Sequence, residues 1–280
     1  MRALDPEVFD AVWAEVEPLL PTPVDDHPLG CHRRRISDRV CLFAMLVRLV
    51  TGCSWVDAER LTGGIVSDTT LRARRDEWNE AEVFDQLAEA MISAYDTKIG
   101  LEPAEALVDG SLHKAPCGGE GTGKSPVDRG KLGWKWSIAT DAKGIPMGWV
   151  VAPANRNDSV LLPATLEAVD DQGLLEEIET LHLDRGYDNS VVRREVAEVG
   201  ITDIVVPRVR SRQGTKRQVP ARVPLGRRWP VERTNSWLSN YGQLRRNTDR
   251  KTDHRSAQLA FVIAILLIAK LLDRGHLSRS

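Results

Sequence analysis

The stretch 134–151, WKWSIATDAKGIPMGWVV, decides the fold predicted for the second half of the chain. Over 134–140, large apolar residues alternate with smaller or polar ones, which is the period-two pattern of a β-strand. Gly144-Ile-Pro predicts a turn into a second strand, Met147–Val151. Together with the apolar run Ala106–Asp109, these segments predict neighbouring strands of an antiparallel meander.

Crossover helices and two further strands are expected after the meander. They are a helix that Asp158 caps and that reaches about Asp170, a strand at 181–184, a helix at 189–199 ended by Gly200, a strand at 204–206, and helices from about 230 to 241 and from 256 to 272. The order β-β-β-α-β-α-β-α predicts an α/β fold, a ribonuclease H-like mixed sheet with flanking helices. We expect it to form a domain over 101–280.

The first hundred residues predict a small helical domain. Its helices are expected at 5–20 with Asp5 as cap, at 36–50 with Ile36, Val40, Phe43, Val47 and Val50 on the apolar side, from a capping box at Ser54 to Leu61, after Ser67 or Asp68, and at 82–99. Short helices joined by tight turns are typical of a helix-turn-helix module. In the helix after Ser67, Leu71 and Trp78 face inward, and Arg72, Arg74 and Arg75 are expected to face outward toward DNA. An ordinary helical bundle with solvated arginines fits the same pattern.

Charge is strongly segregated although the net charge is only −2. Between Val205 and Arg255 fourteen Lys and Arg stand against three acids, whereas the stretch 76–105 carries nine acids and one Lys. A basic block of this density favours contact with the phosphates of double-stranded DNA, because each contact releases condensed counterions. A solvated arm is the alternative.

Nothing in the composition favours a membrane or a disulfide framework. The most apolar run, 259–272, is too short to span a bilayer and carries Lys270, so a buried helix is expected. The polar start of the chain and four cysteines without CxxC spacing suggest reduced thiols and a cytoplasmic protein. Cys31-His32 has no second pair at zinc-finger spacing, so zinc is not expected.

The stretch 117–125, CGGEGTGKS, fits the phosphate-loop template from Gly118 to Ser125. That template binds nucleotides when a helix starts at its Lys. Here Pro126 and Gly130 interrupt any such helix, so no nucleotide cofactor is expected. The alternative is a basic, glycine-rich loop that lies along DNA.

Three acids stand where the predicted elements end or begin. Asp109 and Asp184 each follow an apolar strand, and Glu232 lies in the first turn of a helix. Carboxylates at the ends of neighbouring strands can share Mg²⁺, because hard cations prefer oxygen ligands. Turns at Asp109-Gly110 and Asp184-Arg185-Gly186, and an ion pair of Glu232 with Arg228 or Arg233, are the structural alternatives.

Four segments resemble the conserved blocks of bacterial DDE transposases of the insertion-sequence five type. They are VDGSLHKAPCGGEGTGKSPVDRGKLGWKWSIATD, GWVVAPANRND, LHLDRGYD and RRWPVERTNSWLSNYGQLRRN. The resemblance implies that Asp109, Asp184 and Glu232 form the catalytic triad. It implies two Mg²⁺ ions, with Mn²⁺ as an alternative, and cleavage at terminal inverted repeats followed by joining of 3′ ends to target DNA. A homodimer or larger assembly on DNA is expected.

The resemblance also suggests which basic residues contact DNA. Beside the three arginines of the helix-turn-helix module, the expected contacts are Lys114, Lys124, Arg129, Lys131, Arg228, Arg233, Arg245 and Arg246. Leu225 and Leu238 depart from helper positions of the wider superfamily, and Arg245 or Arg246 is the candidate replacement. Three rivals stay open: a non-catalytic DNA-binding regulator, a phosphate-loop ATPase, and a nuclease that cuts but never joins.

Overall fold

The computed structural model describes residues 2–23, 35–206 and 229–277. The chain divides into two compact units. The first comprises Met1–Ile99, Ala115–Glu120 and Leu238–Ser280, and the second comprises Gly100–Lys114 and Gly121–Trp237. The C-terminal residues, which were expected within 101–280, thus group with the N-terminal helices.

A mixed sheet forms the centre of the second unit. Its strands are β1 (Glu105–Lys114), β2 (Gly123–Lys124), β3 (Leu132–Thr140), β4 (Pro146–Pro153), β5 (Thr180–His182) and β6 (Asp203–Val205). β3 pairs antiparallel with β1, β4 and β2, while β5 runs parallel to both β1 and β6. The predicted meander and the ribonuclease H-like mixed sheet are both confirmed.

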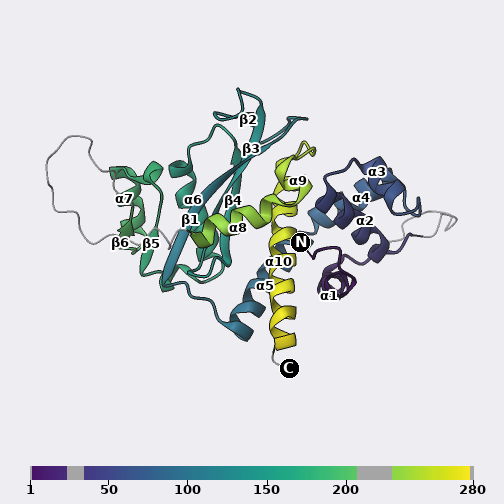
Figure 1. The fold of residues 1–280 in the computed structure, drawn as a ribbon, viewed down its shortest axis with the longest axis horizontal. Helices are drawn as coiled ribbons and strands as arrows, with labels where there is room; N and C mark the ends of the chain where they lie inside the picture. Colours follow the sequence, from purple (N-terminus) through teal and green to yellow (C-terminus); the bar gives the residue numbers. More distant parts are fainter. Residues whose placement is uncertain (1, 24–34, 207–228, 278–280) are drawn as a thin grey trace. The chain divides into compact units, whose positions relative to one another are not determined.

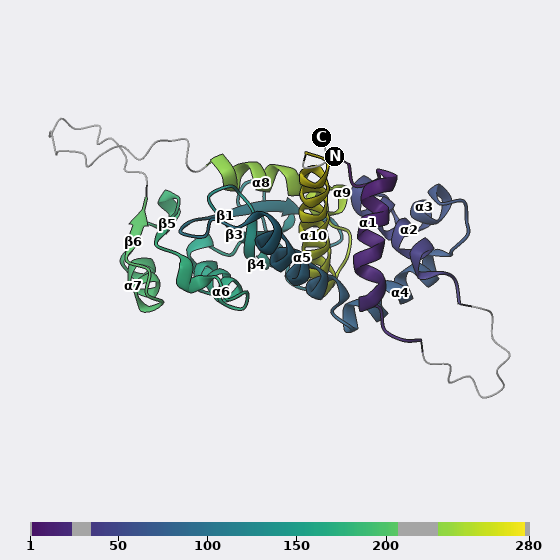
Figure 2. The same cartoon turned by 90° about the horizontal axis from the view of Figure 1, so that it is seen from below.

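Helices cover both faces of this sheet. They are α6 (Asp158–Asp170), α7 (Ser190–Glu198) and the start of α8 (Trp229–Ser239), with short 3-10 turns η2 (Leu175–Glu177) and η3 (Arg185–Tyr187). Thr165 of α6 donates to the Ser137 hydroxyl at 2.8 Å, whereas Asn235 of α8 accepts from the Trp136 indole at 2.7 Å. Successive residues of a strand point to opposite faces, so α6 and α8 lie on opposite sides of β3 (Figure 2).

This double cover changes the meaning of the alternating pattern in β3. Every residue of β3 from Gly133 to Thr140 is buried, including Lys135 and Ser137. One face of β3 therefore carries large apolar side chains and the other carries polar or small ones, and both faces are covered by helices. The alternation does not mark which face is exposed to solvent.

The first unit is helical throughout its described elements. They are α1 (Pro6–Val16), η1 (Glu17–Leu19), α2 (Asp38–Thr51), α3 (Trp55–Leu61), α4 (Asp68–Glu80), α5 (Val83–Ile99), α9 (Gly242–Arg245) and α10 (Thr252–Leu277). Asp5, Ser54 and Ser67 accept backbone N–H groups at the starts of α1, α3 and α4, as predicted. In the second unit, Asn157 caps α6, and the expectation that Asp158 does so is wrong.

The apolar side predicted for α2 is wrong. Phe43 is 37% exposed, whereas Cys41, Leu42, Leu46 and Leu49 are buried. The helix is surrounded on several sides, and its end lies so close to α9 that a Cβ on Gly52 would stand 3.0 Å from the Gly242 backbone. A helix enclosed in this way buries far more than one stripe, so the periodicity does not select a single face.

The helix α10 is longer than expected. It is 26 residues long and has the length and composition of a membrane span, so the reasoning that the apolar run is too short is wrong. Most of its apolar side chains are nevertheless buried inside the protein, and Phe261 packs on Phe84 of α5 with ring centroids 4.5 Å apart. Figure 1 shows α5 and α10 side by side. The prediction of a buried helix is confirmed.

Candidate active site

Asp109 and Asp184 lie at matching positions of two neighbouring strands. β1 and β5 pair in parallel from Glu105–Thr180 to Leu107–His182, a constant offset of 75 residues. The same offset joins Asp109 to Asp184, two residues past the last pair, and the backbone of Asp184 is still extended. Neighbouring strands lie about 4.8 Å apart, so the register brings these two carboxylates to one place.

One detail differs from the sequence prediction. Asp109 does not stand at the end of its own strand, because β1 continues to Lys114. It is the neighbour β5 that ends at His182. The turn proposed as an alternative at Asp109-Gly110 is therefore wrong, whereas the Asp184 carboxylate does accept from the Gly186 N–H at 2.6 Å in a turn.

A chain of hydrogen bonds fixes the Asp109 side chain. The Trp136 indole N–H donates to the Asn235 side chain at 2.7 Å, and the Asn235 amide donates to Asp109 Oδ2 at 3.0 Å. Trp136 and Asn235 are buried, so the carboxylate is held from the core side of α8. Sequence reasoning missed Asn235, although its spacing from Glu232 contained the signal.

Glu232 lies one helical turn before Asn235. Residues three apart on a helix are surface neighbours, with Cβ atoms about 5–6 Å apart. The side chain of Glu232 is exposed, while Asn235 beside it touches Asp109. Glu232 therefore lies on α8 next to the residue that contacts Asp109.

Tyr187 is a buried phenol within electrostatic range of three aspartates. Its side chain is 1% exposed, and burial is the main cause that raises the pKa of its hydroxyl. The carboxylates of Asp158, Asp109 and Asp184, in that order, raise this pKa further. Asp158 was expected only as a helix cap, and the tyrosine of DRGYD was the sequence signal for this buried phenol.

The donor set fits a hard divalent cation in kind, since carboxylate oxygens are the ligands that Mg²⁺ prefers. Within the described ranges, no three His, Cys, Asp or Glu side chains are gathered closely enough to hold a metal ion. Two ionised carboxylates repel at short range unless a cation lies between them. Coordination would require Asp109, Asp184 and Glu232 to turn their side chains toward one another.

The glycine-rich loop does not have the geometry of a phosphate-binding loop. Gly123–Lys124 is the strand β2, so no helix begins at the lysine. The Glu120 backbone N–H donates to the Arg250 carbonyl at 2.8 Å, and a Cβ on Gly119 would stand 2.3 Å from that oxygen. These contacts anchor residues 118–120 within the first unit.

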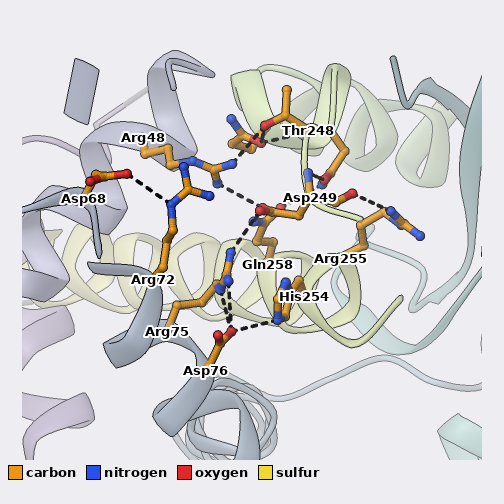
Figure 3. Close-up of polar contacts among 12 residues, drawn as sticks. Arg48, Asp68, Arg72, Arg75, Asp76, Thr248, Asp249, His254, Arg255 and Gln258 are labelled. Carbon is orange, nitrogen blue, oxygen red and sulfur yellow. Dashed lines mark hydrogen bonds and ion pairs between the residues drawn. The ribbon is translucent and has the colours of Figure 1, made fainter. Parts of the chain in front are cut away.

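Two arginines of α4 do not face outward, so that prediction is wrong. Arg74 is 5% exposed and pairs with Asp38 and Glu77. Arg75 is nearly buried and pairs with Asp249 at 3.0 Å (Figure 3). Among the three, Arg72 remains on the surface, where it pairs with Asp68 at 3.3 Å.

The other predicted DNA contacts fall into three groups. Lys114, Lys124, Arg129, Lys131, Arg245 and Arg246 are exposed. Arg233 lies between the Trp229 and Trp237 rings, at 4.5 and 4.6 Å from their centroids, and donates to the Lys143 carbonyl. Arg228 and the part of the basic block over 207–228 lie outside the described residues, as do Cys31 and His32.

His113 is a core residue whose ionisation opposes folding. Its ring stacks on Trp136 with centroids 3.7 Å apart, and burial lowers its pKa to about 3. An unfolded histidine titrates near 6.5, so between these values the unfolded state binds a proton that the folded state does not. Stability therefore falls as the pH falls below about 6.5.

We expect His113→Phe to remove this acid sensitivity while keeping the ring stack. Between pH 7 and pH 5, urea unfolding of the unsubstituted protein should lose about 2 kcal/mol more than unfolding of the variant. Comparing the two proteins cancels other groups that titrate in this range. Equal losses in both would contradict a neutral, buried His113.

Two family descriptions match the chain. Transposase DDE domain matches residues 101–268, and putative transposase of IS4/5 family matches residues 8–88. A putative transposase for insertion sequence element IS402 of Burkholderia cepacia is 35% identical over 144 residues, which cover 49% of this chain and 64% of that protein. An insertion element IS402 uncharacterized 16.2 kDa protein of the same organism is 31% identical over 121 residues, 43% of this chain and 82% of that one.

Two solved structures show a weaker likeness. The Mos1 transposase paired-end complex with left transposon end is 12% identical, with a TM-score of 0.27, over 65% of this chain and 62% of that one. A pre-cleavage Mos1 transpososome is 9% identical, with a TM-score of 0.32, over 89% and 82%. Scores this low carry no argument about the details of the site.

Proposed function

This chain belongs to the transposase DDE domain family, and from that premise we propose that it cuts DNA at the ends of an insertion sequence and joins the 3′ ends to target DNA. The observation that supports the proposal most is the shared offset of 75 residues that aligns Asp109 with Asp184. Glu232 adds a third carboxylate from α8, next to the residue that holds Asp109.

In the proposed reaction, a water and later a DNA 3′-hydroxyl attack a phosphodiester in line with the leaving oxygen. Two Mg²⁺ ions held by Asp109, Asp184 and Glu232 would supply activation of the attacking oxygen and stabilisation of the leaving one. Asn235 orients the Asp109 carboxylate through its 3.0 Å hydrogen bond. Trp136 in turn fixes the amide of Asn235, so the acid is positioned before substrate arrives.

Double-stranded DNA is the proposed partner, bound by a homodimer or a larger assembly. The exposed Lys124 ends β2, and the exposed Arg129 and Lys131 lie in the loop that joins β2 to β3. Cationic side chains in such a loop can hold DNA phosphates in place, and these contacts do not depend on the base sequence. Arg245 and Arg246 offer a second exposed pair in the first unit.

Oligonucleotides with the terminal repeats that flank the gene test the proposal. With Mg²⁺, we expect end cleavage and a strand-transfer product in which the 3′ end is covalently joined to a second DNA. Binding without cleavage would favour a regulator, and cleavage without joining would favour a simple nuclease. ATP turnover without DNA would favour the ATPase, and any of these three results would contradict the proposal.

A further inference from the structure

Asp158 occupies the space next to the residue that follows Asp109. A Cβ built on Gly110 would stand 2.1 Å from Asp158 Oδ1. No side chain fits there unless the Asp158 carboxylate moves, which gives a physical reason for glycine after the first acid. The first turn of α6 therefore brings a fourth carboxylate against the β1 backbone.

A buried lysine holds this carboxylate. The Lys135 side chain is 3% exposed, and its ammonium pairs with Asp158 Oδ1 and donates to the Arg156 carbonyl at 3.2 Å. A buried ammonium needs such partners, because it has left its water behind. The Asp158 side chain, by contrast, is 39% exposed, so only one side of its carboxylate is covered.

The open edge of β1 gives Asp158 access to Asp109. Gly110 and Asp109 point to opposite faces, so the two carboxylates start on different sides of the sheet. Among the described strands, β5 is the neighbour of β1 on this edge, and it pairs only up to Leu107. From Gly110 onward, past the extended Asp184, side chains from both faces can meet around that edge.

The Tyr187 hydroxyl supplies an independent observation at the same place. It is buried and forms no well-aligned hydrogen bond with any described residue. Ser137, the hydroxyl that lowers its pKa, is bonded to Thr165 at 2.8 Å. Among the carboxylates that raise the pKa of Tyr187, Asp158 has the largest effect, ahead of Asp109 and Asp184, so the buried hydroxyl lies within electrostatic range of all three.

We infer that Asp158 is a fourth carboxylate of the acidic centre, held by Lys135 and released from it to bind the same divalent cation as Asp109. The inference rests on the proposed function, because it assumes that Asp109 binds a cation. It also gives Lys135 a role as a competing positive charge. An Asp158 that serves only to neutralise a buried lysine would have no effect on cation affinity.

Mn²⁺ binding to the full chain, measured by electron paramagnetic resonance without DNA, tests the inference. Asp158→Asn should weaken binding about tenfold or more, whereas Asp170→Asn at the other end of α6 should leave it unchanged. Lys135→Met should tighten binding, because it removes the competitor. The double variant Lys135→Met with Asp158→Asn leaves no buried charge unpaired, and it should fold and still bind weakly.

The outcomes separate the inference from the proposed function. If Asp109→Asn abolishes Mn²⁺ binding while Asp158→Asn and the double variant bind like the unsubstituted protein, Asp158 is a structural partner of Lys135 and the inference is wrong. If Asp109→Asn itself binds Mn²⁺ normally, the proposed function fails first. A lower melting temperature of Asp158→Asn with unchanged affinity also contradicts the inference.

Discussion

Asp109→Asn is expected to abolish cleavage of end-containing DNA, with a loss of at least about 10³-fold, the scale seen when one member of a catalytic set is removed. The substitution keeps the shape of the side chain and its contact with Asn235, so the fold should persist. It removes the negative charge that a cation needs. Asp184→Asn and Glu232→Gln should have similar effects, because a shared cation loses an anionic ligand in each case.

Binding of the DNA ends should survive these substitutions, since the proposed DNA contacts are exposed cations elsewhere in the chain. Gel-shift affinity and circular dichroism measured beside cleavage separate a chemical defect from misfolding. Asp170→Asn is the matched control, because it removes an acid from the far end of α6. Mg²⁺-dependent cleavage retained in any one of the three variants would remove that residue from the proposed site.

Asp249→Ala is expected to cause the largest loss of stability, about 3–5 kcal/mol. Asp249 is buried and accepts from Arg48 and Arg75, each at 3.0 Å, and from Gln258 at 2.6 Å (Figure 3). Burial alone would raise the pKa of this carboxyl, but Arg48 and then Arg75 lower it below its ordinary value. Removing the Asp249 carboxylate leaves the guanidinium groups of Arg48 and Arg75 without the negative charge that they share, which destabilises the folded state.

Arg72→Ala provides the contrast within the same helical unit. The two side chains of its pair with Asp68 are 46% and 27% exposed, and such surface pairs contribute less than about 1 kcal/mol. Urea unfolding of both variants measures the difference directly. A decrease in the free energy of unfolding below about 1 kcal/mol for Asp249→Ala would contradict a large contribution of the network in Figure 3 to the stability of the first unit.

The nearness of Asp109 and Asp184 could be predicted from the sequence, whereas their role as catalytic ligands stays a prediction. Asp109 and Asp184 each follow an apolar run, and parallel neighbours bring such positions together. The sequence could not indicate that β1 continues past Asp109, because the polar residue His113 is buried under cover that distant segments provide.

The arginines of α4 show the opposite case. Arg74 and Arg75 lie three or four residues from Leu71 and from Trp78, so helical spacing places all of them on one face of α4. The prediction that the arginines face outward followed from their charge, because a charged side chain is expected in solvent. Arg74 pairs with Glu77 one turn along the helix and with Asp38 of α2, and the Asp249 partner of Arg75 is 174 residues away. Periodicity within one helix contains no information about such a partner.

Anomalous scattering from a crystal of the full chain with Mn²⁺ and cleaved end DNA tests the central claim most directly. The account predicts manganese bound by carboxylate oxygens of Asp109, Asp184 and Glu232, next to the DNA 3′ end. Manganese bound elsewhere, or a Glu232 side chain that stays turned away from a metal held by other residues, would contradict it.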